Sequence, residues 1–195
     1  KGDYGRVLLL CGSRGYTGAP YLAAMGALRS GAGLVYLGVP ESIYGIEATK
    51  LNEAIVFPLP EENGMLCAKA LPKITELLPK MDAVLIGCGL GQSGGTLAVV
   101  KAVLEQAKCP VVVDADGINS LCSHIDTVKE RTGEMVLTPH PGEMARLIGK
   151  SVEYVQKNRI EVATNFAREY GTVVVLKGAG TIIADSSGRL ALSLT

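Results

Sequence analysis

The sequence predicts an α/β fold, with a mostly parallel β-sheet covered by helices on both faces and an antiparallel hairpin at its C-terminal end. Short apolar runs, which are typical of strands buried on both faces, alternate along the chain with amphipathic stretches of helix length. After residue 177 this alternation stops, and two strand-like segments flank a turn at residues 185–188. The 195 residues contain no linker or low-complexity segment, so we expect a single domain over residues 1–195.

Each expected element follows from the local pattern of apolar and turn-forming residues. Strands of the sheet are expected, in chain order, at residues 6–11, 34–39, 54–57, 83–87, 111–114, 135–137 and 173–177. Helices are expected between them near residues 20–30, 66–78, 96–107, 141–147 and 152–170. The terminal hairpin is expected to pair residues 181–184 with residues 189–194.

The composition excludes several classes of function. Basic and acidic residues both number 19 and form no stripe of one sign, so we expect no nucleic-acid partner. The apolar run at residues 7–11 is too short for a signal peptide or a membrane span. The five cysteines are widely spaced and form no C-x-x-C pair, which predicts neither a zinc site nor a disulfide framework. We therefore expect a cytoplasmic protein with no membrane contact.

Two glycine-rich loops follow predicted strands, where open α/β sheets bind their ligands. Residues 12–19 lead into a helix that has Pro20 in its first turn, and the free amides of such a helix start can hold an anion. A plain glycine-rich loop without a ligand is equally compatible with this stretch. Residues 87–95 contain G-x-G-x-x-G as Gly89, Gly91 and Gly94, and Asp114 ends the next strand. That arrangement imitates a dinucleotide-binding fingerprint, so an NAD-dependent dehydrogenase stays open as an alternative.

Charged residues follow three later strands. Asp114 and Asp116 could hold Mg²⁺ through water or orient phosphates, although capping of the next helix is an equal alternative. His140 is fixed between two prolines, with Glu143 three residues later, which suits contacts to a substrate and to metal-bound water. Residues 177–181 offer a lysine, glycine amides and a threonine hydroxyl to a phosphate, without the spacing of a P-loop.

These loops together resemble those of the ADP/ATP-dependent NAD(P)H-hydrate dehydratases, a family of the ribokinase-like superfamily that includes the C-terminal domain of bifunctional NAD(P)H-hydrate repair enzymes. The resemblance covers nearly the whole chain in the family's order. TPHPGEMARL is a highly specific motif, whereas GCGLG alone is not, and Cys88 stands where the family usually has proline. The matching stretches are KGDYGRV (1–7), YTGAPYLAAMGALRSGAGL (16–34), GCGLG (87–91), VVVDADGIN (111–119), LTPHPGEMARL (137–147) and VLKGAGTIIAD (175–185).

The resemblance implies a ribokinase-like three-layer sandwich and dehydration of NADH or NADPH hydrate at the expense of ADP or ATP, with Mg²⁺ as cofactor. Residues at positions that match the family's hydrate contacts are Ala19, Gly89, Gly91 and His140. Residues expected to bind the nucleotide are Lys177, Gly178, Ala179, Gly180, Thr181, Asp114 and Asp116, and Glu143 is expected to hold Mg²⁺ through water. A homo-oligomer, fused to or partnered with an NAD(P)H-hydrate epimerase, is also expected.

Members of this family continue into a glycine-rich loop that ends in G-x-G-D, and the Asp of this loop resembles their catalytic base. We expect that Asp to lie beyond Thr195, so no catalytic residue is assigned within the chain, and the chain alone is expected not to turn over. Two further alternatives remain. One is a small-molecule kinase of the same fold that phosphorylates a vitamin precursor, and the other is a binding module that senses nucleotide without turnover.

Overall fold

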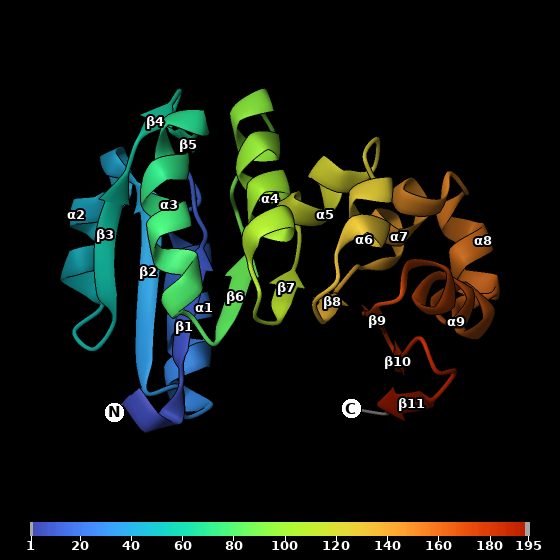
Figure 1. Ribbon diagram of the computed structural model, residues 1–195. Coiled ribbons are helices and arrows are strands. Elements are labelled where there is room, and N and C mark those ends of the chain that lie inside the picture. Colours follow the sequence, from blue (N-terminus) through green and yellow to red (C-terminus); the bar gives the residue numbers. More distant parts are fainter. Residues whose placement is uncertain (1, 194–195) are drawn as a thin grey trace.

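The structure, a computed structural model, describes residues 2–193 and confirms the predicted α/β fold (Figure 1). The strands are β1 (Arg6–Leu10), β2 (Leu34–Pro40), β3 (Ile55–Leu59), β4 (Glu61–Glu62), β5 (Met65–Leu66), β6 (Ala83–Ile86), β7 (Val111–Val113), β8 (Met135–Leu137), β9 (Val173–Leu176), β10 (Thr181–Ala184) and β11 (Leu190–Ser193). The helices are α1 (Gly18–Arg29), α2 (Glu41–Lys50), α3 (Leu71–Leu77), α4 (Gly94–Gln106), α5 (Asp116–Leu121), α6 (Asp126–Glu130), α7 (Pro141–Ile148), α8 (Val152–Lys157) and α9 (Arg159–Tyr170).

The main sheet has nine strands in the order β11-β10-β9-β8-β7-β6-β1-β2-β3. Strands β1 to β3 and β6 to β9 are parallel, and the antiparallel hairpin of β10 and β11 is confirmed at the end of the chain. Leu194, the last residue of that predicted hairpin, lies outside the described residues. The chain runs outward from β1 to β3, then crosses to the other side of β1 and continues from β6 to β9. This reversal creates a topological switch point between β1 and β6.

The reversal also places helices on opposite faces, because crossovers between parallel strands share one handedness. The larger apolar core packs α3, α4, α7 and α9 on one face, against buried side chains such as Ile86, Val113 and Leu176. A smaller core packs α1 and α2 on the other face, around Leu9 and Leu37. Full burial of each such side chain stabilises the fold by about 1.5–3 kcal/mol before entropy is counted.

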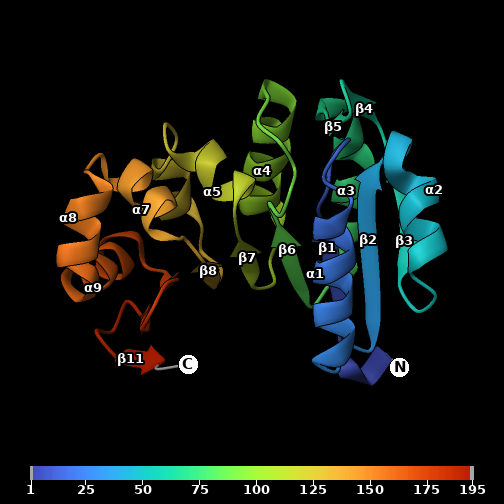
Figure 2. The same ribbon diagram turned by 180° about the vertical axis from the view of Figure 1, so that it is seen from behind.

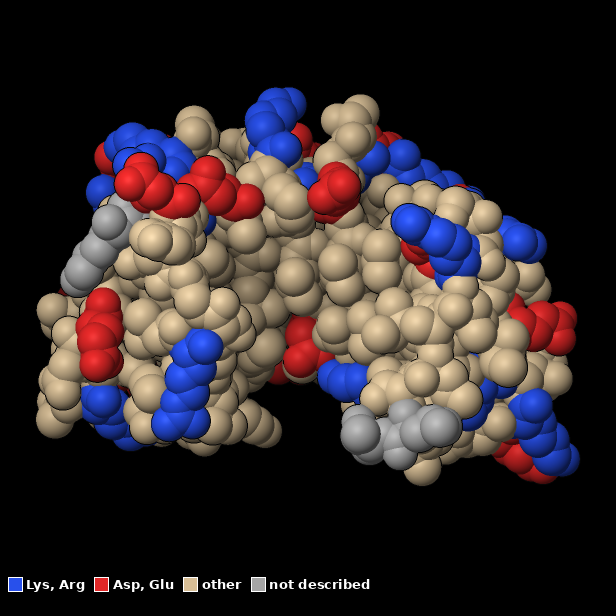
Figure 3. Space-filling view, turned by 90° about the horizontal axis from the view of Figure 1, so that it is seen from below, with Lys and Arg blue, Asp and Glu red and all other residues tan. Residues whose placement is uncertain are grey.

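The second face is only partly covered by the part of the chain that the structure describes. In Figure 2, α1 lies in front of β1 and β2, whereas β6 and β7 are open to the viewer. On this face Leu85, Val112 and Val136 are half-buried, and Ile183 of β10 is 38% exposed. Figure 3 shows that the surface seen from below is hollowed between two lobes, with acidic and basic side chains meeting at the hollow.

Several helices differ from the sequence-based expectation. Helix α2 was not predicted, because its apolar positions are few and only Ile43 of its apolar side chains is buried. The helix expected at 66–78 is confirmed only from Leu71, since residues 61–66 pair as the β4–β5 hairpin. The helix expected at 152–170 breaks at Asn158, whose φ of −124° separates α8 from α9. No helix among residues 2–193 combines the length and apolarity needed to cross a membrane.

Helix α2 buries an acidic side chain that has no hydrogen-bond donor. Glu47 is fully buried, and neither of its carboxylate oxygens has a hydrogen-bond partner in residues 2–193. Lys50 Nζ lies 3.6 Å from Oε1, and burial raises the pKa of Glu47 more than this cation lowers it. A carboxyl group with a raised pKa in the folded state favours folding at low pH and opposes it above that pKa.

We therefore expect Glu47→Met, which removes the buried charge at similar volume, to raise the free energy of unfolding at neutral pH by about 1 kcal/mol. The gain should shrink as the pH falls through the pKa of Glu47, because the wild-type carboxyl is then neutral. Urea unfolding at several pH values measures both effects, with Glu53→Met at an exposed loop position as the control. A loss of stability at neutral pH would contradict this account of α2.

Candidate active site

The structure places all the predicted ligand-binding loops at one edge of the sheet. They follow β1, β6, β7, β8 and β9, which are consecutive neighbours in the sheet order. Because these strands are parallel, their C-terminal ends and the loops after them lie on the same side. His140 and Lys177 therefore lie at the same edge, and the amide of Lys177 donates to the carbonyl of Pro139 at 2.9 Å.

The loops after β1 and β6 meet at the switch point. The Ser13 hydroxyl donates to the Gly89 carbonyl at 2.8 Å, and the Gly12 amide donates to the Cys88 carbonyl at 2.8 Å. A Cβ atom added to Gly89 would lie 2.9 Å from the Cβ of Ala19, so these two residues touch. Glycine is required here because its φ is +68° and because Ala19 and Tyr16 take the space that a side chain would fill.

The loops after β6 and β7 interlock through backbone contacts that require glycine. Gly87 has a φ of +126°, and a Cβ atom there would lie 1.9 Å from the Asp114 carbonyl oxygen. That carbonyl accepts from the Gly117 amide at 2.9 Å, closing a turn in which Ala115 has a φ of 50° and a ψ of −117°. Such a conformation strains a residue with a Cβ atom and is retained only where surrounding contacts enforce it.

The side chain of Asp114 joins three of the loops. Its Oδ1 accepts from Lys177 Nζ and from the Thr138 hydroxyl, both at 2.7 Å, and Cys88 Sγ lies 3.6 Å from Oδ2. Burial alone would raise the pKa of Asp114, but the hydrogen bonds from Lys177 and Thr138 and the lysine charge outweigh it. The pKa therefore lies below its ordinary value, and the carboxylate is ionised beside the lysine.

Asp116 fixes the loop after β6 instead of capping a helix. Its Oδ2 accepts from the Gly91 amide at 2.9 Å, and Ala115, the N-cap of α5, makes no side-chain capping bond. The alternative in which one of the two aspartates caps the following helix is therefore wrong. Both carboxylates tie neighbouring loops together, so the crevice is held in shape before any ligand binds.

His140 and Glu143 form a capping box at the start of α7. His140 Nδ1 accepts from the amides of Gly142 and Glu143 at 3.0 and 3.3 Å, and Glu143 Oε2 accepts from the His140 amide at 2.8 Å. Because Nδ1 is an acceptor, the proton of the neutral ring is on Nε2. The imidazole is half exposed, whereas the Glu143 side chain is 5% exposed. His140 Nε2 lies 3.4 Å from Glu143 Oε1, so both ring nitrogens face groups at the start of α7 and the imidazole is held in place.

The turn between β9 and β10 carries the predicted phosphate-binding residues. Gly178 and Gly180 both have positive φ, of 141° and 70°. The Thr181 hydroxyl donates to the Gly178 carbonyl at 3.0 Å, so it stabilises the turn itself. Lys177 lies at the start of this turn, where its side chain is 40% exposed and its ammonium group contacts Asp114.

The β4–β5 hairpin adds a wall to the site that sequence reasoning missed. The Arg14 amide donates to the Gly64 carbonyl at 2.8 Å, and a Cβ atom on Gly91 would lie 2.5 Å from Met65 Sδ. The dipeptide Asn63-Gly64 is the usual signal of a two-residue hairpin turn and could have predicted it. Met65 therefore lies over the loop after β6.

The crevice continues into an open, largely apolar groove of about 490 Å³ on the less covered face of the sheet. It joins the N-terminal turns of α1 to the ends of β6, β7 and β8, and Asp114 is its charged residue. Its lining residues are Ala19, Leu22, Ala23, Leu85, Cys88, Val112, Asp114 and Thr138. The Asp114 carboxylate in this lining is already paired with Lys177.

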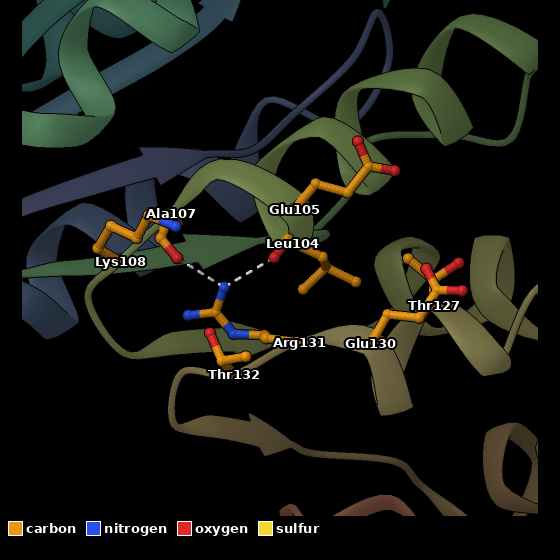
Figure 4. A pocket seen from close by; sticks show the side chains of 8 residues that line it. All are labelled: Leu104, Glu105, Ala107, Lys108, Thr127, Glu130, Arg131 and Thr132. Atoms are coloured by element: carbon orange, nitrogen blue, oxygen red, sulfur yellow. Dashed lines mark hydrogen bonds between the residues drawn. The ribbon is translucent and has the colours of Figure 1, made fainter.

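A second cavity, of about 150 Å³, lies at the opposite end of α4 and is structural (Figure 4). Arg131 Nη1 donates to the carbonyls of Leu104 and Ala107 at 2.9 and 2.8 Å, as the dashed lines in Figure 4 show. The guanidinium thus satisfies the last carbonyls of α4, which have no partner within the helix. This contact explains the cavity without a ligand.

Comparison with known proteins agrees with the geometry. The family model described as NAD(P)H-hydrate dehydratase matches residues 7–194. The bifunctional NAD(P)H-hydrate repair enzyme of Moorella thermoacetica is 44% identical over 196 residues, covering 100% of this chain and 37% of that protein. The ADP-dependent (S)-NAD(P)H-hydrate dehydratase of Bacillus subtilis is 37% identical over 195 residues, covering 100% of this chain and 66% of that protein. The chain thus spans just over a third of its bifunctional relative.

Solved structures show the same fold. The ADP/ATP-dependent NAD(P)H-hydrate dehydratase of Bacillus subtilis, co-crystallised with ATP/Mg²⁺, superposes with a TM-score of 0.81 at 35% identity, covering 100% of this chain and 65% of that one. A ribokinase-like superfamily protein of Enterococcus faecalis gives a TM-score of 0.83 at 25% identity, covering 98% of this chain and 63% of that one. The motifs, the ribokinase-like fold and the matched residues lead to one assignment: this chain belongs to the NAD(P)H-hydrate dehydratase family.

Proposed function

We propose that this chain carries the substrate-binding edge of an enzyme that converts the hydrates of NADH and NADPH back to NADH and NADPH at the expense of ADP or ATP. One observation carries the proposal. The crevice formed by the glycine-rich loops and the turn that bears Lys177 lie next to each other, and the bond between Asp114 and Lys177 joins them. A kinase-like reaction needs two ligands side by side, and these loops offer two adjacent sites.

The hydrate occupies the crevice at the switch point. Gly89 packs against Ala19 at the start of α1, and Gly91 packs against Met65, and these close contacts shape the floor of the crevice over which the ligand lies. The half-exposed imidazole of His140 contacts the hydrated ring. The residues of this site are those expected from the sequence. Ala19 and Gly89 touch, and all four residues follow strands at the same edge of the sheet, which supports the assignment.

The nucleotide phosphates lie on the turn after β9. Lys177 supplies a positive charge, and Gly178, Ala179 and Gly180 supply amides, while Thr181 holds the turn in shape. Asp114 orients the lysine toward the crevice. Asp116 contributes indirectly, because it accepts a hydrogen bond from the Gly91 amide and so holds the loop after β6 in place.

The reaction itself is a phosphoryl transfer followed by elimination. The hydroxyl on ring carbon 6 gives its proton to the base expected beyond Thr195 and attacks the terminal phosphorus of ADP or ATP, and AMP or ADP leaves. The lone pair of the ring nitrogen then forms a double bond to carbon 6 as the carbon–oxygen bond breaks and inorganic phosphate departs. Loss of the proton on carbon 5 restores the dihydronicotinamide. Residues of this chain align the two ligands and neutralise phosphate charge, which are the main contributions a protein makes to phosphoryl transfer.

Mg²⁺ fits this site as an ion held by phosphates. Within residues 2–193 no three His, Cys, Asp or Glu side chains gather as a metal cage. A nucleotide-bound Mg²⁺ needs only one or two carboxylates, often through water. Glu143 Oε2 completes the capping box and Oε1 lies 3.4 Å from His140 Nε2, so Glu143 would hold such an ion through water. Bound Mg²⁺ would supply charge neutralisation at the phosphates.

The dehydrogenase alternative fits the geometry poorly. In a dinucleotide-binding fingerprint the glycine-loop amides and the strand-end carboxylate are free to bind the cofactor. Here the Gly91 amide is taken by Asp116, and Asp114 is paired with Lys177. A small-molecule kinase would use the same crevice, but it would release a stable phosphoester.

The proposal extends to the location of the protein and to its partners. We place the protein in the cytoplasm, because the five cysteines are all free thiols, as a reducing compartment favours. We also propose a homo-oligomer that is fused to or works beside an NAD(P)H-hydrate epimerase, since several relatives are named bifunctional repair enzymes.

Turnover assays test the proposed function. The assay uses the protein together with the segment expected beyond Thr195, since the chain alone is expected not to turn over. Incubation with NADH hydrate, Mg²⁺ and ADP or ATP is then expected to restore the dihydronicotinamide absorbance and to release one inorganic phosphate per molecule restored. A stable phosphorylated product without recovery of absorbance would favour the small-molecule kinase. Hydride transfer without any adenine nucleotide would favour the dehydrogenase.

A further inference from the structure

Arg159, to which the sequence pattern assigned no role, holds the backbone of the phosphate turn. It begins α9, and its Nη2 donates to the carbonyls of Leu176 and Gly180 at 3.0 Å each. Both Nη atoms also lie 3.3 Å from the Lys177 carbonyl, and Nη1 donates to Gln156 Oε1 at 3.1 Å. One guanidinium group thus donates hydrogen bonds to carbonyls at both ends of the turn between β9 and β10.

This contact leaves amides as the free polar groups of the turn. The Gly178 carbonyl accepts from Thr181, so the carbonyls of residues 176, 177, 178 and 180 all have donors. Among the described residues, none accepts from the amides of Gly178, Ala179 or Gly180. Successive free amides in a tight turn form a concave anion-binding surface. The guanidinium charge beneath the carbonyls adds to the positive potential of that surface.

Resting on the proposed function, we propose that Arg159 is a positioning residue for the terminal phosphate of the adenine nucleotide. It acts through the turn and does not touch the phosphate, because its Nη donors are already bound to backbone carbonyls and Gln156. Lysine cannot replace it, since a single ammonium group lacks the planar set of donors that spans several carbonyls.

Nucleotide binding by Arg159→Lys and Arg159→Ala tests this role. Both variants are expected to bind ADP and ATP about tenfold more weakly, with NADH hydrate affinity unchanged within about twofold. AMP, which lacks the phosphate that the turn holds, is expected to bind all forms equally. Millimolar methylguanidinium is expected to restore part of the ADP affinity of Arg159→Ala, whereas urea at the same concentration is not. Arg168→Lys, on the same helix but beside Gly188, is the matched control and should bind as wild type.

The outcomes separate this inference from the proposed function. If wild-type protein binds neither ADP nor ATP, the proposed function fails. If wild-type protein binds both and the Arg159 variants bind them equally well, only the role of Arg159 is overturned. Equal losses of AMP, ADP and hydrate affinity in the variants would also overturn it, because they would indicate general damage to the fold.

Discussion

Gly87→Ala is expected to lower the free energy of unfolding by about 3 kcal/mol or more, through steric overlap and backbone strain together. The glycine has a φ of +126°, which L-residues rarely adopt, and its added Cβ would lie 1.9 Å from a backbone oxygen of Asp114. That oxygen cannot move freely, because the Asp114 amide donates to the Ile86 carbonyl at 3.1 Å in the sheet. Urea unfolding measures the loss directly.

Gly26→Ala is the matched control for this substitution. Gly26 lies inside α1, its φ is not positive, and no atom lies within 4 Å of an added Cβ. Alanine there should leave stability unchanged or raise it by up to about 1 kcal/mol, because alanine favours helix. If Gly87→Ala were as stable as Gly26→Ala, the loops after β6 and β7 would not be interlocked as described.

Lys177→Met is expected to weaken ADP and ATP binding by about 1.5–3 kcal/mol, or about 10- to 150-fold, through loss of a charge-assisted phosphate contact. The substitution also leaves Asp114 half-buried without its cation, which raises the pKa of that carboxyl. Isothermal titration with each nucleotide measures the affinity. Lys157→Met, whose partner Glu153 is 75% exposed, should bind as wild type, and equal losses in both variants would refute a specific role for Lys177.

The same pair predicts a pH dependence with a defined sign. Asp114 has a lowered pKa in the folded state, so its ion pair stabilises the protein above the ordinary aspartate pKa. This contribution is lost as the pH falls through the lowered value. In Lys177→Met the acid-side loss of stability should therefore be smaller than in wild type, and thermal melts from neutral to acidic pH measure the difference.

The sequence could predict those parts of the fold that depend on local patterns. Apolar runs such as residues 111–113 identify strands whatever their neighbours are, and strand ends then place Gly89, His140 and Lys177 at one edge. The pattern of apolar residues could not predict which side chains from different strands contact one another. The bond of Asp114 to Lys177 joins residues 63 apart, and nothing local distinguishes it from a metal or phosphate contact.

The sequence pattern failed to predict two features, helix α2 and the contacts of Arg159. Helix α2 forms because the sheet offers Ile43 an apolar surface, not because its own sequence strongly favours helix. Arg159 binds the turn after β9 because α9 starts where α8 ends. The helical pattern at 152–170 is continuous, so it does not predict this break. Both features depend on tertiary packing, and the helix propensity of the local sequence predicts neither of them.

The central claim is that two ligands share this edge on different loops, and their separate binding tests it most directly. His140→Asn retains an acceptor for the start of α7 but removes the Nε2–H donor, and it should weaken NADH hydrate binding while ADP binding stays intact. Lys177→Met should do the reverse. Titrating both ligands into both variants gives four affinities, and the account predicts a loss for one ligand in each variant. Equal losses of both ligands in both variants would contradict it.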